Sequence, residues 1–271
     1  MQKRILTAVV GIPFAIFVIN YGQWLYDIVI GLLALLAWLE FQGMMQQGKS
    51  IPVWPGLGFG GTALLLVMAA IGWFNLFVFG ILMIVFMALT KPLFYQEEFA
   101  MEAAAWTVLG VLYVGLSFSH LLLLRFSADA MLPVGMTQGT VYLWMAFLGT
   151  WASDTFAYLI GSKWGKHKLC PRISPGKTVE GALGGLAGSL AVVAGFGFYL
   201  MIPLIHALSI GLLVGIAAPI GDLVESALKR FAGVKDSGSV LPGHGGILDR
   251  FDGIMFAAPA VYYYALIFVF S

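Results

Sequence analysis

The chain contains few charged residues and a single cysteine. Only 10% of its 271 residues are Asp, Glu, Lys or Arg, against roughly 25% in an average soluble domain. Cys170 stands alone, which excludes an internal disulfide and a cysteine-based zinc cluster. The sequence also shows no Ser-His-Asp or Cys-His arrangement, no internal repeat and no flexible linker. We therefore expect neither a covalent nucleophile nor a second, soluble domain.

Apolar residues are abundant instead. They make up 61% of the chain, and the mean hydropathy is +0.95, whereas roughly 45–50% of a soluble domain is apolar. Lys3 and Arg4 precede the first apolar run as they would in a signal peptide, but no cleavage pattern lies near Asn20 and another apolar run follows. The composition predicts an integral membrane protein with a retained first span.

The apolar runs are long enough for several membrane crossings. A crossing helix needs about 20 apolar residues, and the runs that qualify are 5–21, 24–42, 55–71, 73–90, 103–124, 139–160, 180–203, 206–228 and 253–270. At the junctions 20–23 and 71–73, two helices could instead form one kinked helix. The prediction is an all-α, polytopic membrane protein with about nine transmembrane helices.

The basic residues give the orientation. A cytoplasmic N-terminus leaves only Arg125 outside and places the other basic residues inside, which is the positive-inside pattern. Residues 1–137 contain no dense polar cluster, and we expect them to form a transmembrane scaffold region of about five helices. Residues 138–271 form a catalytic transmembrane region with two polar cytoplasmic loops.

The first of these loops follows a span that contains an acidic residue. Asp154, Tyr158 and Gly161 share one helical face, and a carboxylate in a span is tolerated when it faces a polar interior. A hydrogen bond between packed helices is the alternative.

The end of this first loop carries an expected anion site. Ser174 and Pro175 are a good N-cap and first residue for the seventh helix, with Lys177 and Thr178 in its first turn. Free amides at a helix N-terminus beside a lysine bind anions.

Small residues recur four apart in the seventh helix. Gly181 and Gly185 form one such pair, and Gly184 and Gly188 form another. This spacing predicts close helix packing, within one chain or between two.

Two pairs of carboxylates flank the second polar loop. Asp222 and Glu225 lie three apart near the end of the eighth span, and Asp249 and Asp252 lie three apart at the start of the ninth. Such oxygen ligands suit Mg²⁺, which takes one or two carboxylates together with substrate phosphates. Basic residues and glycines between the pairs would bind the phosphates. Taken singly, helix capping by the aspartates or a pair between Glu225 and Lys229 is an alternative, but capping alone does not explain why these features occur together between Asp222 and Asp252. The pattern predicts a metal-dependent, phosphate-handling site at the cytoplasmic face.

Residues 150–255 also resemble a known family. The residues that carry this resemblance are Asp154-Thr155, Tyr158, Ile173-Ser174-Pro175, Lys177-Thr178-Val179-Glu180-Gly181, Ser226, Lys229-Arg230, Lys235-Asp236, Gly238, Leu241-Pro242, His244-Gly245-Gly246, Asp249-Arg250 and Asp252. They are similar to the signature of the phosphatidate cytidylyltransferases. That family condenses CTP with phosphatidic acid to CDP-diacylglycerol and pyrophosphate in phospholipid biosynthesis.

The resemblance implies a set of functional residues. The expected catalytic residues are Asp222, Asp249, Lys229, Arg230 and Lys235. Asp222 and Asp249 are the leading metal ligands, and Asp252, Glu225 and Asp154 are further candidates. The residues expected to bind substrate or phosphate are Lys177, Thr178, Ser174, Arg250, His244, Gly245 and Gly246.

The resemblance also implies cofactors, partners and a location. It implies Mg²⁺, with room for a second cation, and a homodimer in the inner (plasma) membrane with its active site facing the cytoplasm. CTP, phosphatidic acid and the bilayer are the expected partners, and nucleic acid is not. A CTP-dependent polyprenol kinase and a non-enzymatic membrane transporter are the alternatives. The first would release CDP, and the second would show no turnover.

Overall fold

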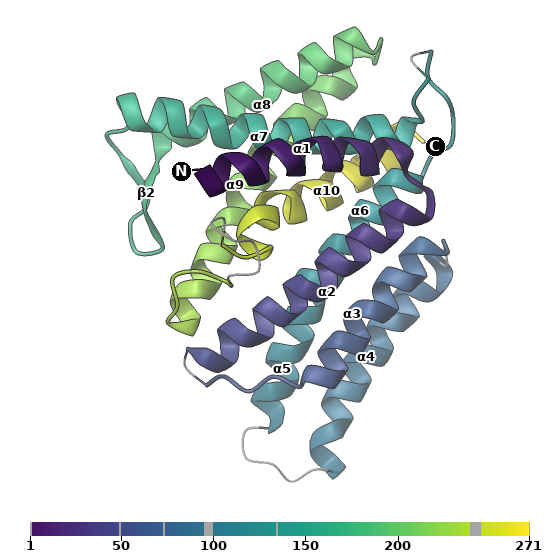
Figure 1. Ribbon diagram of the computed structural model, residues 1–271, viewed down its shortest axis with the longest axis vertical. Helices are drawn as coiled ribbons and strands as arrows, with labels where there is room; N and C mark the ends of the chain where they lie inside the picture. The colour runs from purple at the N-terminus through teal and green to yellow at the C-terminus, as the bar shows by residue number, and fades with distance from the viewer. Residues whose placement is uncertain are drawn as a thin grey trace. The chain divides into compact units, whose positions relative to one another are not determined.

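The structure is a computed structural model that describes residues 2–48, 50–72, 74–94, 100–133, 135–238 and 245–270. Its helices are α1 (Gln2–Tyr21), α2 (Gln23–Gln47), α3 (Pro55–Ala70), α4 (Phe74–Phe94), α5 (Ala100–Gly110), the π-helical segment η1 (Val111–Leu116), α6 (Ser117–Phe126), α7 (Gln138–Trp164), α8 (Val179–Tyr199), α9 (Leu204–Ala232) and α10 (Leu248–Phe268). Two short strands, β1 (Lys168–Cys170) and β2 (Ser174–Thr178), lie between α7 and α8 (Figure 1).

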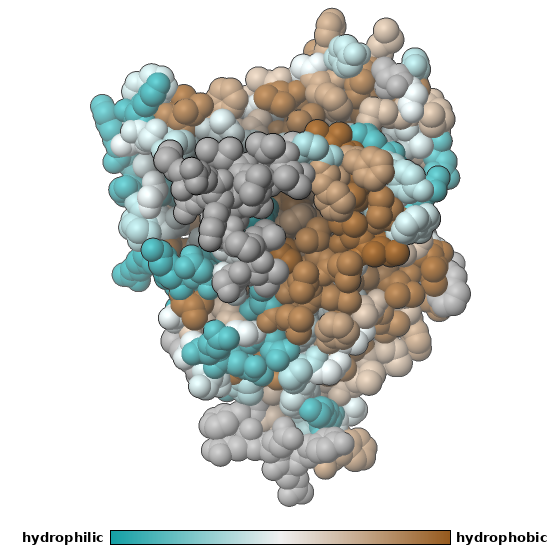
Figure 2. All heavy atoms as spheres, viewed as in Figure 1, coloured by the Kyte–Doolittle hydropathy of each residue, from teal (hydrophilic) through white to brown (hydrophobic). Residues whose placement is uncertain are grey.

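Every predicted apolar run coincides with a helix, and α5, η1 and α6 together cover the run 103–124. Within the described residues, six segments are long and apolar enough to cross a membrane: 23–47, 76–94, 100–126, 179–199, 204–232 and 248–268. Large apolar side chains such as Leu32, Leu39 and Phe86 are exposed, and Figure 2 shows apolar residues over a broad area of the face it presents. The chain is therefore a multi-pass, helical membrane protein. The total of nine crossings and the cytoplasmic N-terminus stay predictions.

The junctions between neighbouring apolar runs are breaks between helices. Helix α1 ends at Tyr21, and Gly22 adopts a left-handed φ of 64° before α2 begins. Helix α3 ends at Ala70, and Gly72 has a φ of 70°. Glycine adopts such angles at little cost because it has no Cβ. The alternative of one kinked helix does not hold at the first junction, and at the second, Trp73 lies outside the described residues.

The described contacts divide the chain into two compact units. The first unit holds Met1–Leu123 and Lys229–Arg250, and the second holds Leu124–Leu228 and Phe251–Ser271. Helices α9 and α10 contribute residues to both. The loop that carries much of the family signature therefore packs with the first half of the chain. The predicted division at residue 137 concerns function, and it stays a prediction.

Close helix packing builds each unit. In the first unit, α2, α3 and α4 lie side by side (Figure 1), and Trp38 of α2 is fully buried against Gly58 of α3. In the second unit, α7 and α8 pack along their length. A Cβ on Gly185 would come within 2.8 Å of the Ser153 carbonyl oxygen, and one on Gly184 within 2.6 Å of Ile160. The small-residue spacing in α8 thus gives packing within the chain, as one of the two predicted outcomes.

The strands correct one prediction. Ser174 and Pro175 do not start a helix, because β2 pairs antiparallel with β1 and opposes Ser174 to Cys170. The N-cap of α8 is Thr178, whose Oγ1 accepts a hydrogen bond from the Gly181 amide at 3.1 Å. Strand pairing satisfies the backbone of 174–178, so the helix begins only where this pairing ends. Within the described residues, the fold is helical with one added two-stranded hairpin.

Candidate active site

A pocket of about 430 Å³ lies in the second unit. Its lining comes from α7, the hairpin, α8 and α9, and includes Asp154, Tyr158, Gly161, Lys177 and Asp222. The predicted common face of α7 is confirmed, because its three residues all line this pocket. A cavity with a few convergent polar groups is the usual form of a small-molecule site.

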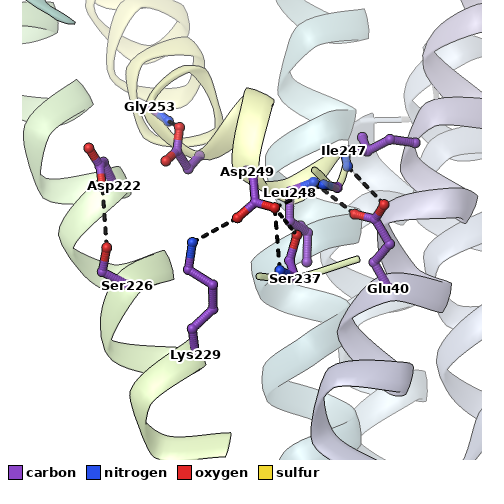
Figure 3. Close-up of polar contacts among 11 residues, drawn as sticks. Glu40, Asp222, Ser226, Lys229, Ser237, Ile247, Leu248, Asp249 and Gly253 are labelled. Atoms are coloured by element: carbon purple, nitrogen blue, oxygen red, sulfur yellow. Dashed lines mark hydrogen bonds and ion pairs between the residues drawn. The ribbon is translucent and has the colours of Figure 1, made fainter. Parts of the chain in front are cut away.

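Lys177 joins the hairpin to α9 inside this pocket. Its Nζ lies 2.7 Å from Oδ2 of Asp222 and donates to the carbonyl oxygen of Pro219 at 3.4 Å. Oδ1 of Asp222 accepts from the Ser226 hydroxyl at 3.3 Å (Figure 3). The Lys177 and Asp222 side chains are 23% and 36% exposed, so a ligand can reach both.

Two further carboxylates act on this ion pair. Gly221 of α9 packs directly against the backbone of Asp252 in α10, which a larger residue would prevent. Asp252 interacts electrostatically with Asp222, Asp154 and Lys177. Three acidic side chains, Asp154, Asp222 and Asp252, therefore influence one another and one lysine, and a bound cation would relieve the repulsion among them.

The donor set fits Mg²⁺ held jointly with a substrate. Among the described residues, no group of three or more His, Cys, Asp or Glu is arranged to hold a metal by itself. Mg²⁺ seldom uses such a cage, because it is usually bound by one or two carboxylates, water and substrate phosphates. Asp154 and Asp222 on the pocket wall meet that requirement.

A second network surrounds Asp249 in the first unit (Figure 3). Lys229 donates to its Oδ1 at 2.7 Å. The Ser237 hydroxyl and the Gly246 amide donate to its Oδ2 at 2.9 and 2.8 Å. The Lys229 and Asp249 side chains are each only 14% exposed. The same motif thus occurs twice: a carboxylate pairs with an ammonium group at Asp249 with Lys229 and at Asp222 with Lys177.

The remaining predicted residues occupy varied positions. Arg230, Lys235 and Arg250 are exposed in the first unit. Gly245 has a φ of 84°, and His244 lies outside the described residues. Ser174 lines the pocket, and Glu225 is buried at 2% exposure.

Sequence reasoning missed Ser237 and Glu40. Glu40, assigned to the scaffold region, accepts hydrogen bonds from the amides of Ile247 and Leu248 at 2.9 and 3.0 Å (Figure 3). The available signal is a carboxylate within an apolar span, the same signal that singles out Asp154. Ser237 carries no comparable signal, since a loop serine is common.

Fold and site together define a multi-pass helical membrane protein with paired carboxylates and lysines suited to phosphate chemistry. A family model described as "Cytidylyltransferase family" matches residues 2–268. The chain belongs to this family and is a nucleotidyltransferase.

Relatives extend the similarity over the whole chain. The chain is 37% identical to a phosphatidate cytidylyltransferase of Staphylococcus haemolyticus over 265 residues, 96% of each chain. It is 35% identical to one of Bacillus subtilis over 277 residues, 99% of this chain and 98% of the relative. A third, from Staphylococcus aureus, is 36% identical over 264 residues, 96% of each chain. The first half, which the signature did not cover, is thus shared with these enzymes.

Proposed function

We propose that this chain is a phosphatidate cytidylyltransferase, which condenses CTP with phosphatidic acid to CDP-diacylglycerol and pyrophosphate. The observation that carries the proposal is the Lys177–Asp222 ion pair in a pocket of a membrane protein of this family. The pair supplies both a cation for phosphate and a carboxylate for metal. The relatives with this printed name support the choice of substrates.

The reaction is an in-line displacement at phosphorus. A phosphate oxygen of phosphatidic acid attacks the α-phosphorus of CTP, and the bond from that phosphorus to the bridging oxygen of the β-phosphate breaks. Pyrophosphate leaves with the bonding electron pair. No side chain forms a covalent intermediate, so the residues bind, orient and neutralise the reacting anions.

The lysines are the residues that respond to the phosphates. Without substrate, Lys177 is held by Asp222 and Lys229 by Asp249. Arriving phosphates compete for each ammonium group, and the released carboxylate becomes available to a cation. The exposed Arg230, Lys235 and Arg250 add positive charge for CTP or the lipid phosphate. Ser174, Thr178, His244, Gly245 and Gly246 complete the proposed substrate-binding set.

Asp222 and Asp249 would be the principal Mg²⁺ ligands. Asp154, Asp252 and Glu225 would be further ligands of the same ion or would bind a second cation. Bound Mg²⁺ would neutralise charge on the phosphates and on the departing pyrophosphate. The chain's own part is to hold Asp222 beside Lys177 and Asp249 beside Lys229. Ser226 and Ser237 orient these two carboxylates.

The setting follows from the substrates. One is held in the leaflet and the other is dissolved in the cytosol, so the site belongs at the boundary between them. We propose that the protein lies in the plasma membrane with its active site facing the cytoplasm, and that it functions as a homodimer. The positive-inside pattern and the bacterial relatives support the location.

Purified protein in detergent tests the proposal. The reaction contains CTP, Mg²⁺ and phosphatidic acid, with parallel reactions that omit each component or offer polyprenol as acceptor. Pyrophosphate together with a CMP-bearing lipid, only when all three are present, supports the proposal. CDP formed with polyprenol would make the chain a kinase. No turnover in either reaction, from protein shown to be folded, would favour transport.

A further inference from the structure

A buried carboxylate in the first half of the chain holds the backbone that leads into Asp249. Glu40 lies in α2, a segment apolar enough to cross a membrane, and is only 6% exposed. Burying a carboxylate is unfavourable unless it is hydrogen-bonded, and acidic residues within spans mark functional positions. The partners of Glu40 therefore indicate its role.

These partners are amides at the start of α10. The Ile247 amide donates to Oε1 and the Leu248 amide to Oε2, across more than two hundred positions of sequence. The first amides of a helix have no partner within that helix, and a carboxylate there also interacts favourably with the helix dipole. Glu40 thus performs a capping role, which the sequence offered only as an alternative and for the aspartates of α10.

Two glycines, one on each side of the residues that the structure leaves undescribed, lie close to this carboxylate. A Cβ on Gly238 would lie 2.8 Å from Cγ of Glu40, and a Cβ on Gly246 would lie 2.6 Å from its Oε2. Glycines are therefore required on both sides of Glu40. The backbone at Gly238 and at Gly246 therefore fits closely around this side chain.

The same loop turn orients Asp249. Three consecutive amides are divided between two carboxylates: that of Gly246 donates to Asp249, and those of Ile247 and Leu248 donate to Glu40. A shift that breaks the bonds to Glu40 moves the Gly246 amide as well. It also changes the direction in which Asp249 meets Lys229.

We infer that Glu40 is a positioning residue, which sets the orientation of Asp249 through the amides of 246–248. This inference rests on the proposed function, since it matters for catalysis only if Asp249 acts there. Both carboxylate oxygens accept from amides and the side chain is buried, so Glu40 acts through the loop without touching substrate. It assigns a role to α2, a helix outside the predicted catalytic region.

The test compares Glu40→Gln with Gln46→Ala, an exposed position near the end of the same helix. In Glu40→Gln, an NH₂ group faces one of the two amides and that bond is lost. We expect the Mg²⁺ concentration for half-maximal turnover to rise about 10–100-fold, the range typical when a group that orients a metal ligand is removed. Gln46→Ala should leave it unchanged.

Amide hydrogen exchange supplies a readout besides activity. Peptides covering 245–250 should exchange faster in Glu40→Gln, while the rest of α10 keeps its protection. Should Glu40→Gln not fold, Gly238→Ala serves instead, because it displaces the carboxylate and keeps its charge. Unchanged exchange at 245–250 together with an unchanged Mg²⁺ dependence, in a folded variant, would overturn the inference. An inactive wild type would overturn the proposed function, whereas an active wild type with a silent substitution would overturn only the role of Glu40.

Discussion

Lys177 of β2 and Asp222 of α9 form an ion pair with 2.7 Å between Nζ and Oδ2. The pair connects the β1–β2 hairpin to helix α9. The charge pattern predicts that this hairpin lies on the cytoplasmic side, and α9 is apolar enough to cross a membrane. Both side chains line the pocket and remain partly exposed. An exposed pair adds little stability, typically less than about 1 kcal/mol, so the arrangement is better explained by ligand binding.

Replacing Lys177 by Met should lower kcat about 10²–10³-fold, because one cationic donor to the reacting phosphates is lost. Lys168→Met removes the same charge from an exposed site on β1 of the same hairpin, and should keep near wild-type turnover. Pyrophosphate release measures both. Equal losses in the two variants would mean that only the hairpin's total charge matters.

Asp249→Asn should abolish turnover and leave the protein folded. The Asn side-chain oxygen can still accept from Ser237 and Gly246, but it no longer carries a charge for metal or for Lys229. Thermal unfolding in detergent checks the fold, and Asp129→Asn, at an exposed position, is the matched control. Near-normal activity of Asp249→Asn would remove this residue from the metal site.

Removing Mg²⁺ with EDTA should stop turnover, and Mg²⁺ added in excess over the chelator should restore it. Asp154, Asp222 and Asp252 repel one another, and they would also repel incoming phosphates, so phosphates should bind poorly without a cation. Pyrophosphate release and retention of CTP on the protein are the measurements. Undiminished turnover in EDTA would contradict the metal assignment.

Gly185→Ala should destabilise the packing of α7 against α8. The new Cβ would meet the Ser153 carbonyl oxygen at 2.8 Å, and overpacking typically costs about 1–3 kcal/mol. Gly195→Ala in the same helix meets nothing within 4 Å and should be neutral or slightly stabilising, since alanine favours helices. Thermal unfolding compares the Tm values of the two variants, and equal values would count against the close contact at Gly185.

The lone Cys170 reports which side of the membrane the hairpin faces. It lies in β1 and is partly exposed. A membrane-impermeant maleimide should label it in inside-out vesicles and not in intact cells. Cys170→Ser should remove the signal, and Ala130→Cys in that background should label from the opposite side. Labelling of Cys170 from outside would reverse the proposed orientation.

The positions of the helices follow from the sequence, because a chain in lipid must satisfy its backbone hydrogen bonds internally and long apolar runs therefore become helices. The sequence also predicts that the glycines of α8 form one packing face, since residues four apart lie on the same side of a helix. The same spacing argument predicts the shared face of Asp154, Tyr158 and Gly161, and all three line the pocket.

Contacts between distant segments decided the rest. Serine and proline at 174–175 favour a helix start, but pairing with β1 holds them extended. Folding also brings Asp249 to Lys229 across twenty positions of the chain, a contact that local spacing does not indicate. The first turn of α10 receives its cap from Glu40 in another helix. Local spacing determines which residues share a face, but the partner of a buried charge depends on which segments meet, and only the tertiary structure decides that.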